Sequence, residues 1–487
     1  MQPPPPPPPA PRLAECPGPG DAGLAFPAPD RRADPGKLKV ATFNAEWLFD
    51  GVGDNSRSPW RDDPAGAAGH LARVADVLAG LDADLVDLAE VEDCAVLKAL
   101  AENLNARPGN AGREYAPYLV KGKDTYTGQN VALLARVDPV GPLDRTEARA
   151  AYPVAGSACG YGGEAHDYGV SKHYRALFHI GGRKVAVLGC HFLAFPTDKT
   201  RCAKREAQAT VVRDLAEAAR GKGYDDVVIL GDFNDYSDAV LDVQGSRPTS
   251  RVLRLLRDLD ADGRDDLAEA AALLPQAQRW TSWWDHLPKD GKDGGTAEHT
   301  SIDHLLLSNS LMAYAASAEV PHGMDPTAVS DHWPLAVTLD FGAPPHPSPP
   351  PPPPVFPPPP PPCDCCPQPP PGLPEPARER AAAAAAASAQ CPAEEAGPLP
   401  QALGISDQAF LVGAGGLAVG LAVGGLAGWL WGRRRVGGRR GSVTYMELQG
   451  AGRRASGTLD PAGLGVDARS RQASLVRGGG RPGPPPF

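Results

Sequence analysis

Short apolar runs recur along residues 37–341, and most of them stop at a polar or charged residue. The most sharply bounded run covers residues 227–230 (Val-Val-Ile-Leu) and is followed by Gly231, Asp232, Phe233 and Asn234. Four consecutive branched apolar residues between turn residues are typical of a strand that is buried on both faces. Ligands of open α/β sheets bind just beyond the ends of such strands. The run therefore predicts a buried strand that presents Asp232 and Asn234 to a site. An ordinary strand followed by an Asx turn is the alternative, because Asp and Asn favour turns.

Two runs nearer the N-terminus end in the same way. Residues 37–44 alternate between polar and apolar side chains and lead to Asn44 and Glu46, and the run 85–89 ends at Glu90. A helix is predicted between these two runs by an apolar stripe of Leu71, Val74, Leu78 and Leu81. The order strand, helix, strand indicates a layered α/β core. A carboxylate at position 90 is also typical of a helix start, so this second interpretation of Glu90 stays open.

Polar side chains adjoin later apolar runs as well. His191 follows the run 184–190, and Asp303, Asp331 and His332 lie beside two runs nearer the C-terminus. A single histidine is often a packed or hydrogen-bonded structural residue, so His191 has a structural as well as a functional interpretation. The repetition of the pattern favours a functional interpretation of these residues.

Three further residues are candidates for contacts with phosphate. Asn130 precedes the strand-like run 131–136, and Lys172 and Arg175 lie just before the run 176–180. Both cations suit phosphate oxygens. Solvated surface charge explains Lys172 and Arg175 equally well.

The composition divides the chain into five parts. Its 56 Pro residues are concentrated in flanks that cannot form a core. We therefore predict one folded domain with four other segments, namely a disordered Pro-rich arm over 1–36, the folded domain over 37–342, a Pro-rich and Ala-rich stalk over 343–408, a transmembrane helix over 409–431 and a basic disordered tail over 432–487.

The predicted membrane segment is apolar and rich in glycine. Residues 410–431 carry no charged side chain and are long enough to cross a bilayer as a helix. Glycines recur at every fourth position, which would give the helix a smooth face for a homodimer, at Gly416, Gly420, Gly424 and Gly428. Chance recurrence in a Gly-rich and Ala-rich segment is the alternative.

Charged residues around this segment predict its orientation. Five arginines follow it, whereas acidic residues precede it: Arg433, Arg434, Arg435, Arg439 and Arg440, against Glu394, Glu395 and Asp407. The positive-inside rule places the tail in the cytoplasm and the folded domain outside the cell or in a lumen. No secretory signal is visible in residues 1–36. Either a signal lies upstream of Met1, or the folded domain stays in the cytosol; the first is favoured.

Net charge restricts the class of partner. The chain carries a formal charge of −10, even though its C-terminal tail is basic. Broad, salt-dependent adhesion to nucleic acid needs a basic surface, so this mode of binding is not expected. A phosphate substrate that is bridged by a metal ion is compatible with an acidic domain.

The nine cysteines fit neither a dense disulfide framework nor a regular zinc pattern. Cys159 and Cys202 flank the strand that ends at His191 and would pair in an oxidising compartment. Cys190 competes as a partner, and free thiols are the remaining alternative.

Six separated motifs together resemble the endonuclease/exonuclease/phosphatase (DNase I-like) superfamily. They occur in the family's order within residues 37–341, as Thr42-Phe43-Asn44-Ala45-Glu46, Leu88-Ala89-Glu90, Cys190-His191-Phe192, Gly231-Asp232-Phe233-Asn234, Ser301-Ile302-Asp303-His304 and Ser330-Asp331-His332. The resemblance implies a four-layer α/β/β/α sandwich whose strand ends meet at one rim. It also implies cleavage of phosphate esters with Mg²⁺, or with Mn²⁺ in its place.

The resemblance assigns roles to these residues. Glu90 would be the principal metal ligand, assisted by Glu46 and Asp331, and Asn44 would contact phosphate. Asp232 and Asn234 would orient or deprotonate the attacking water. His332, paired with Asp303, would act as a base or hold a phosphoryl oxygen, and His191 would serve the leaving or non-bridging oxygen.

Two departures from the family pattern qualify this assignment. Glu46 is longer than the Asp common at that point, and the segment after Trp280 lacks the motif of the inositol phosphatases. We predict a membrane-anchored, Mg²⁺-dependent phosphodiester hydrolase of nuclease type. The alternatives are a sphingomyelinase-type lipid phosphodiesterase or phosphatase, and an inactive ectodomain that serves adhesion. The expected substrate is accordingly a phosphodiester in nucleic acid or phospholipid.

Overall fold

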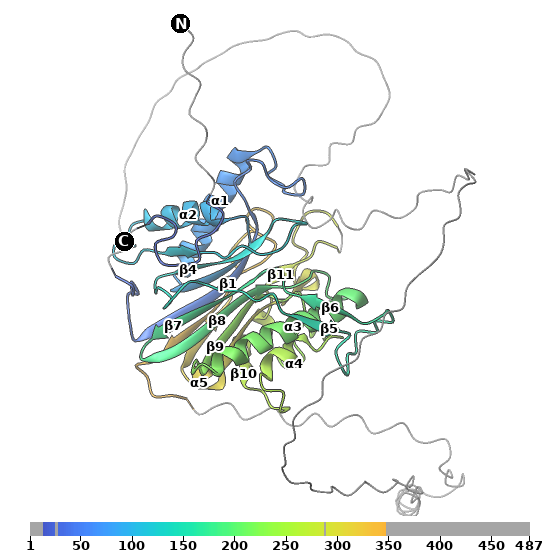
Figure 1. Cartoon of the computed structure of the whole chain (residues 1–487). Helices are drawn as coiled ribbons and strands as arrows, with labels where there is room; N and C mark the ends of the chain where they lie inside the picture. The colour runs from blue at the N-terminus through green and yellow to red at the C-terminus, as the bar shows by residue number, and fades with distance from the viewer. Residues whose placement is uncertain (1–12, 25–27, 287–288, 347–487) are drawn as a thin grey trace, which may run out of the picture. The chain divides into compact units, whose positions relative to one another are not determined.

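The computed structural model describes residues 13–24, 28–286 and 289–346 (Figure 1). The predicted stalk, membrane segment and basic tail, with the four-glycine face, lie outside these residues. Of the helices within the described residues, none combines the length and the apolar character that a bilayer-spanning segment needs.

A six-stranded sheet forms one half of the core. Its strands run in the order β14 (Ala315–Glu319), β15 (Leu335–Asp340), β1 (Lys37–Leu48), β2 (Leu85–Val91), β4 (Asn130–Ala135) and β3 (Ala116–Tyr118). β1 and β2 are parallel, and the other neighbours are antiparallel. The parallel pair therefore brings the carboxyl ends of β1 and β2 to the same edge.

A five-stranded sheet forms the other half. Its order is β10 (Leu267–Glu269), β13 (Asp303–Ser308), β9 (Asp226–Asp232), β8 (Arg183–His191) and β7 (His173–Ile180). β8 and β9 are parallel, and the remaining pairs are antiparallel. Two small hairpins complete the strands, β5 (Arg149–Tyr152) with β6 (His166–Gly169) and β11 (Ser282–Trp283) with β12 (His299–Thr300).

Helices cover the outer face of each sheet (Figure 1). The three longer helices are each capped at the N-terminus by an aspartate, namely Asp63, Asp93 and Asp198. Each carboxylate accepts a hydrogen bond from the backbone N–H three residues further on. A cap of this kind stabilises a helix by about 1 kcal/mol. The helices are α1 (Pro64–Leu81) and α2 (Cys94–Asn105) on the six-stranded sheet, α3 (Lys199–Arg220) and α4 (Val252–Arg257) on the other, and the short α5 (Asn309–Met312).

Three apolar layers hold the four layers of structure together. Alternate residues of the two sheets meet in the central layer, where Val40 and Leu85 from one sheet join Val187 and Val228 from the other. The opposite face of the six-stranded sheet packs on α1 and α2, and that of the five-stranded sheet packs on α3 and α4. The predicted α/β/β/α order is therefore what the described residues form.

The N-terminal segment differs from its prediction. Cys16 forms a disulfide with Cys94 at the start of α2 and pairs by backbone hydrogen bonds with Leu119. Arg31 is 2% exposed, and its guanidinium lies 2.6 Å from Asp138. The prediction that residues 1–36 form a disordered arm is thus wrong for residues 13–24 and 28–36, because a covalent bond and a buried ion pair attach them to the domain.

The predicted Cys159–Cys202 disulfide is present, and it joins the segment between β5 and β6 to the first turn of α3. Cys190, its competitor for a partner, is buried and free. The pairing attaches the glycine-rich stretch to the helix that precedes β9.

Candidate active site

The predicted site residues converge because adjacent strands end together. In the five-stranded sheet, Asp232 pairs in register with His191 on one side and with Asp303 on the other. In the six-stranded sheet, Asn44 pairs with Ala89, one residue before Glu90. The two sheets meet at this edge, where the side-chain amide of Asn44 donates to Asp232 Oδ2 at 3.0 Å.

Gly231 makes the approach of β8 and β9 possible. Its φ of +138° disfavours any L side chain, and a Cβ atom there would lie only 1.8 Å from the carbonyl oxygen of Cys190. This geometry explains why glycine precedes Asp232 in the sequence. Glycine allows close contact of the strands, and the next residue, Asp232, enters the site.

Unusual backbone conformations concentrate at the same place. Glu46, Trp47, Glu90 and Asn234 have φ values of +46°, +56°, +66° and +51°. Asn adopts this region readily, but Glu and Trp seldom do, and each such residue costs on the order of 1 kcal/mol. Strain of this kind is typical of functional sites, where the surrounding structure fixes the position of a side chain.

A buried triad of two carboxylates and one imidazole forms the centre. His332 Nδ1 lies 2.7 Å from Asp303 Oδ2, and His332 Nε2 lies 3.9 Å from Asp232 Oδ2. His191 Nε2 lies 3.6 Å from the same oxygen of Asp232. The backbone N–H of Asn234 donates to the other oxygen, Oδ1, at 2.9 Å. Asp232 is therefore shared by two histidines, an amide side chain and a backbone N–H.

Burial and charge give these groups different protonation behaviour. Burial raises the pKa of Asp232 to about 7, with a further rise from Asp303, although His332 opposes the change. Burial alone would lower the pKa of His332, but Asp303 and the neighbouring carboxylates raise it well above its usual value. Burial, with Lys172 and His332 nearby, holds the pKa of His191 well below its usual value. The site thus combines a cationic and a neutral histidine with a carboxyl that titrates near neutrality.

A second group of oxygen ligands lies at the ends of β1 and β2. Glu90 accepts a hydrogen bond from the Trp47 backbone N–H at 3.0 Å and lies 3.4 Å from the Asn44 amide. Glu46 accepts from the backbone N–H of Asp331 at 3.1 Å. Burial, followed by the charge of Asp331, raises the pKa of Glu90.

These residues fit a divalent metal ion. They are hard oxygen donors of the type that Mg²⁺ prefers, and Glu90 is the kind of partly buried carboxylate whose charge a cation would compensate. The longer side chain of Glu46 does not take it away from the site, because its carboxylate contacts the backbone of Asp331.

The three residues predicted to contact phosphate differ in their surroundings. Lys172 Nζ lies 3.4 Å from Gln129 Oε1 and 3.6 Å from Asp124 Oδ2, and its charge acts on both Glu90 and His191. A cation at this position lies near both Glu90 and His191, and its contact with phosphate stays a prediction.

Arg175 and Asn130 have structural contacts instead. Arg175 makes a bidentate ion pair with Asp144, at 3.0 and 2.6 Å. The Asn130 amide donates to the Glu92 carbonyl at 2.7 Å, and its oxygen accepts from the Gly122 N–H at 2.7 Å. These contacts favour a structural role for both residues, because their polar groups hold neighbouring segments in place. Their assignment to phosphate stays a prediction.

Two hydroxyl residues of the site went unpredicted. Thr281 Oγ1 accepts from the Asp303 N–H at 3.1 Å, and Ser330 Oγ donates to the Asn44 carbonyl at 2.7 Å. They fix the backbone on either side of the triad. Ser330 is part of the Ser-Asp-His motif and was open to prediction, whereas Thr281 lies in an irregular aromatic stretch without such a signal.

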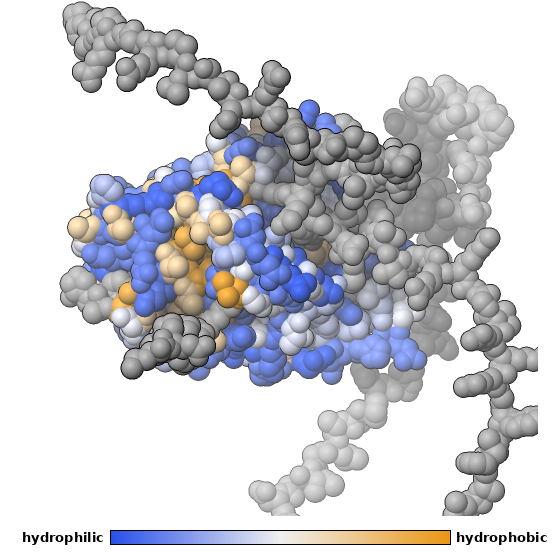
Figure 2. All heavy atoms as spheres, turned by 90° about the horizontal axis from the view of Figure 1, so that it is seen from above, coloured by the Kyte–Doolittle hydropathy of each residue, from blue (hydrophilic) through white to orange (hydrophobic). Residues whose placement is uncertain are grey.

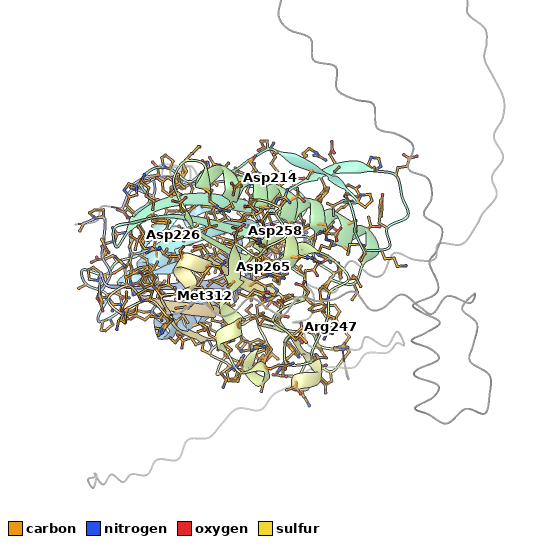
Figure 3. The ribbon with its side chains drawn as sticks, turned by 90° about the horizontal axis from the view of Figure 1, so that it is seen from below. Asp214, Asp226, Arg247, Asp258, Asp265 and Met312 are labelled. Atoms are coloured by element: carbon orange, nitrogen blue, oxygen red, sulfur yellow. A yellow bond between two sulfur atoms is a disulfide. The ribbon has the colours of Figure 1, made fainter. Side chains whose placement is uncertain are left out.

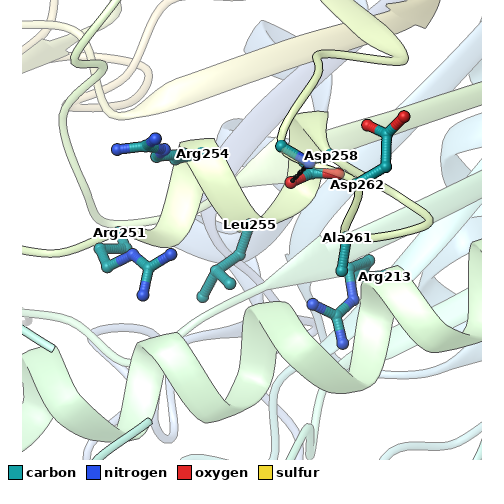
Figure 4. A pocket seen from close by; sticks show the side chains of 8 residues that line it. Arg213, Arg251, Arg254, Leu255, Asp258, Ala261 and Asp262 are labelled. Carbon is teal, nitrogen blue, oxygen red and sulfur yellow. Dashed lines mark hydrogen bonds between the residues drawn. The ribbon is translucent and has the colours of Figure 1, made fainter. Parts of the chain in front are cut away.

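The surface offers a different hollow as well, between α3 and α4. It is lined by Arg213, Arg251, Arg254, Leu255 and Asp258, together with the loop that follows α4 (Figure 4). No residue of the triad lines it, so it is separate from the candidate active site. The face of the molecule seen from above is mainly hydrophilic and is interrupted by an apolar area (Figure 2).

Comparison with known families agrees with the site. The model of the Endonuclease/Exonuclease/phosphatase family matches residues 41–332, from the middle of β1 to His332. This match covers all six motifs and more than half of the chain. The chain belongs to the Endonuclease/Exonuclease/phosphatase family.

Solved structures with a similar arrangement share little sequence with this chain. The endonuclease/exonuclease/phosphatase from Beutenbergia cavernae is 18% identical, with a TM-score of 0.40, over 62% of this chain and 71% of the other. The 3'-5' exonuclease NExo from Neisseria meningitidis is 18% identical, with a TM-score of 0.39, over 62% and 100%. Truncated TDP2 from Caenorhabditis elegans is 17% identical, with a TM-score of 0.35, over 62% and 97%. A comparison with curated protein sequences gives no match.

Proposed function

We propose that this protein is a divalent-metal-dependent phosphodiester hydrolase of nuclease type, anchored to a membrane by residues 409–431. The single observation that carries the hydrolase proposal is the triad of Asp232, His332 and Asp303 next to the Asn44–Glu90 pair. An adhesion domain would have no use for buried, strained and mutually perturbed ionisable groups of this kind.

The residues of the chain divide the chemistry between them. Glu90, with Glu46 and Asp331, would hold Mg²⁺ or Mn²⁺, and this ion would neutralise charge on the phosphate as the ester bond breaks. Asp232 orients and deprotonates the attacking water, because its raised pKa makes it a base suited to neutral pH. Asn234 has its backbone N–H on Asp232 and keeps the carboxylate in position.

The two histidines take different parts. His332 is cationic and suits a phosphoryl oxygen rather than a proton from water, and Asp303 fixes its tautomer and orientation. His191 is neutral and lies on the other side of Asp232, where it serves the leaving oxygen. Asn44 and Lys172 contribute a neutral and a charged donor toward phosphate.

A substrate panel tests this proposal. The purified full-length protein in detergent would be incubated with Mg²⁺ and with plasmid DNA, RNA, sphingomyelin or inositol phosphates. We expect cleavage of nucleic acid that stops in EDTA. In His332→Gln and Asp232→Asn, kcat should fall by about 10²-fold or more, because each change removes a group that acts in the transition state.

Exposed residues of the same types provide the controls. His179→Gln and Asp290→Asn change exposed side chains away from the triad and should keep full activity. Undiminished turnover in EDTA or in either site variant would reject the mechanism. Cleavage of sphingomyelin alone would keep the mechanism and change the substrate to a lipid.

A further inference from the structure

A second group of carboxylates lies in the loop that follows β1. Asp50, Asp54 and Glu92 each direct one carboxylate oxygen into a common space, with these oxygens all within 4.8 Å of one another. Glu92 directly follows β2, and the two aspartates come from the loop. The group shares no residue with the triad or with the proposed Mg²⁺ ligands.

Asp54 distinguishes this group from ordinary surface acids. The residue is only 9% exposed, and its Oδ1 atom is buried without a hydrogen-bond partner. Its other oxygen accepts from Ser58 Oγ at 2.8 Å. A buried carboxylate oxygen that lacks a partner costs free energy, and a cation is the partner that also offsets the repulsion from Asp50 and Glu92.

We propose that Asp50, Asp54 and Glu92 bind a structural Ca²⁺ ion. Calcium takes oxygen ligands at 2.3 to 2.6 Å, so two ligands on opposite sides of the ion lie about 4.6 to 5.2 Å apart. The three carboxylate oxygens all lie within 4.8 Å of one another, so one calcium ion can reach all of them. Calcium also accepts the irregular geometry of ligands from a loop, whereas Mg²⁺ demands a nearly ideal octahedron. Waters and loop carbonyls complete the shell.

The ion orders a loop beside the catalytic rim. The Asn55 side chain donates to the Tyr126 carbonyl at 2.9 Å, and the Arg57 guanidinium lies 3.6 Å from the centre of the Tyr126 ring. Tyr126 belongs to the turn whose Asp124 contacts Lys172. Calcium therefore keeps residues 50–58 against the turn that positions Lys172.

Calcium binding to the full-length protein tests the site directly. Equilibrium dialysis with radioactive Ca²⁺, in excess Mg²⁺, should give one bound ion in the wild type and in Glu90→Gln, which removes the proposed Mg²⁺ ligand. Asp54→Asn and Glu92→Gln should each weaken binding by at least about tenfold, because each removes a charged ligand. Because the two substitutions are independent, the test remains valid if one of the two variants does not fold.

Two other aspartates provide matched controls. Asp62→Asn changes an exposed residue at the end of the same loop and should leave binding intact. Asp260→Asn changes the other acidic cluster, Asp258, Asp260 and Asp262, which follows α4. Its first residue, Asp258, is labelled in Figure 3. Unchanged binding in Asp54→Asn, or loss of the ion in Glu90→Gln or Asp260→Asn, would overturn the proposal.

Proteolysis gives a second measurement. Ca²⁺ should slow tryptic cleavage after Arg57 and Arg61 in the wild type and in Asp62→Asn, but have no such effect in Asp54→Asn. Equal protection by Mg²⁺ alone would also count against a calcium site.

Discussion

Two buried histidines on either side of one carboxylate show how single neighbours determine charge. His332 and His191 both approach Asp232, at 3.9 and 3.6 Å. His332 has Asp303 on its far nitrogen, whereas Nδ1 of His191 has no hydrogen-bond partner and Lys172 lies nearby. Their pKa values therefore move in opposite directions. The same residue type gives a cation on one side of the site and a neutral ring on the other.

Lys172 and Arg175 should respond oppositely to substitution. Lys172→Met is expected to lower kcat/KM by about tenfold, because it removes a cation beside Glu90 and His191. Arg175→Met should leave kcat/KM nearly unchanged but lower the free energy of unfolding by about 1 kcal/mol, because Asp144, whose side chain is 51% exposed, loses its bidentate partner. Steady-state kinetics and urea unfolding of both variants would decide. A large loss of kcat/KM in Arg175→Met would assign Arg175 to the phosphate site.

At the scale of elements, a strand could be predicted where its own sequence is an apolar run that ends at a polar residue. The runs ending at Glu90, His191 and Asp232 are β2, β8 and β9, with the polar residues where the apolar pattern stops. Contacts between distant, irregular segments had no such signal. Asp144, the partner of Arg175, lies outside any regular strand, and Cys16 pairs with a cysteine 78 residues away. Sequence periodicity describes an element, but it does not identify the partner of a loop.

The Cys16–Cys94 disulfide should contribute substantially to stability. Cys16→Ser with Cys94→Ser is expected to lower the free energy of unfolding by roughly 2 to 4 kcal/mol, since the bond closes a long loop in the unfolded chain. Guanidinium unfolding of the double variant, compared with wild type under non-reducing conditions, measures the effect. An equal free energy of unfolding in the double variant and the wild type would show that Arg31 and backbone pairing alone hold the N-terminal segment.

β7 carries a histidine that makes stability depend on pH. Burial, followed by the charge of Arg145, lowers the pKa of His173 to about 4, and its ring nitrogen accepts the Thr146 N–H at 3.0 Å. The unfolded chain takes up a proton below about pH 6.5, but the folded chain does so only near pH 4. This residue should therefore reduce the free energy of unfolding as pH falls from 6.5 to 4, by about 3 kcal/mol in all, at about 1.4 kcal/mol per pH unit.

His173→Gln isolates that contribution, because Gln still accepts a hydrogen bond but does not titrate. Urea unfolding of both proteins at several pH values should show a smaller loss of stability for the variant between pH 6.5 and 4. Parallel curves would assign the pH dependence to other groups.

At the scale of the whole domain, the site depends on how the two sheets pack. Asn44 from one sheet reaches Asp232 of the other, so neither sheet holds a complete site. The two sheets also approach closely at Asp87, which is fully buried and accepts a hydrogen bond from Thr42 within its own sheet. A Cβ atom on Gly189 of the facing sheet would lie only 2.1 Å from the Asp87 carboxylate, so glycine is needed there. The family resemblance predicted this convergence, but the sequence periodicity alone did not, because period-two patterns do not state which faces of two sheets meet.

The orientation of the whole chain is the last prediction. Two disulfides, Cys16–Cys94 and Cys159–Cys202, are typical of an oxidising compartment, and the arginines after residue 431 favour a cytoplasmic tail. We therefore expect protease added to intact cells to cut the catalytic domain, while an epitope fused to the C-terminus is cut only after detergent opens the membrane. Protection of this C-terminal epitope in intact cells shows that the membrane is closed in the same sample. A catalytic domain that resists protease until detergent is added would place it in the cytosol or inside a closed compartment. Non-reducing peptide mapping of the cellular protein separates those two cases, because disulfides that form in an oxidising lumen would be reduced thiols in the cytosol.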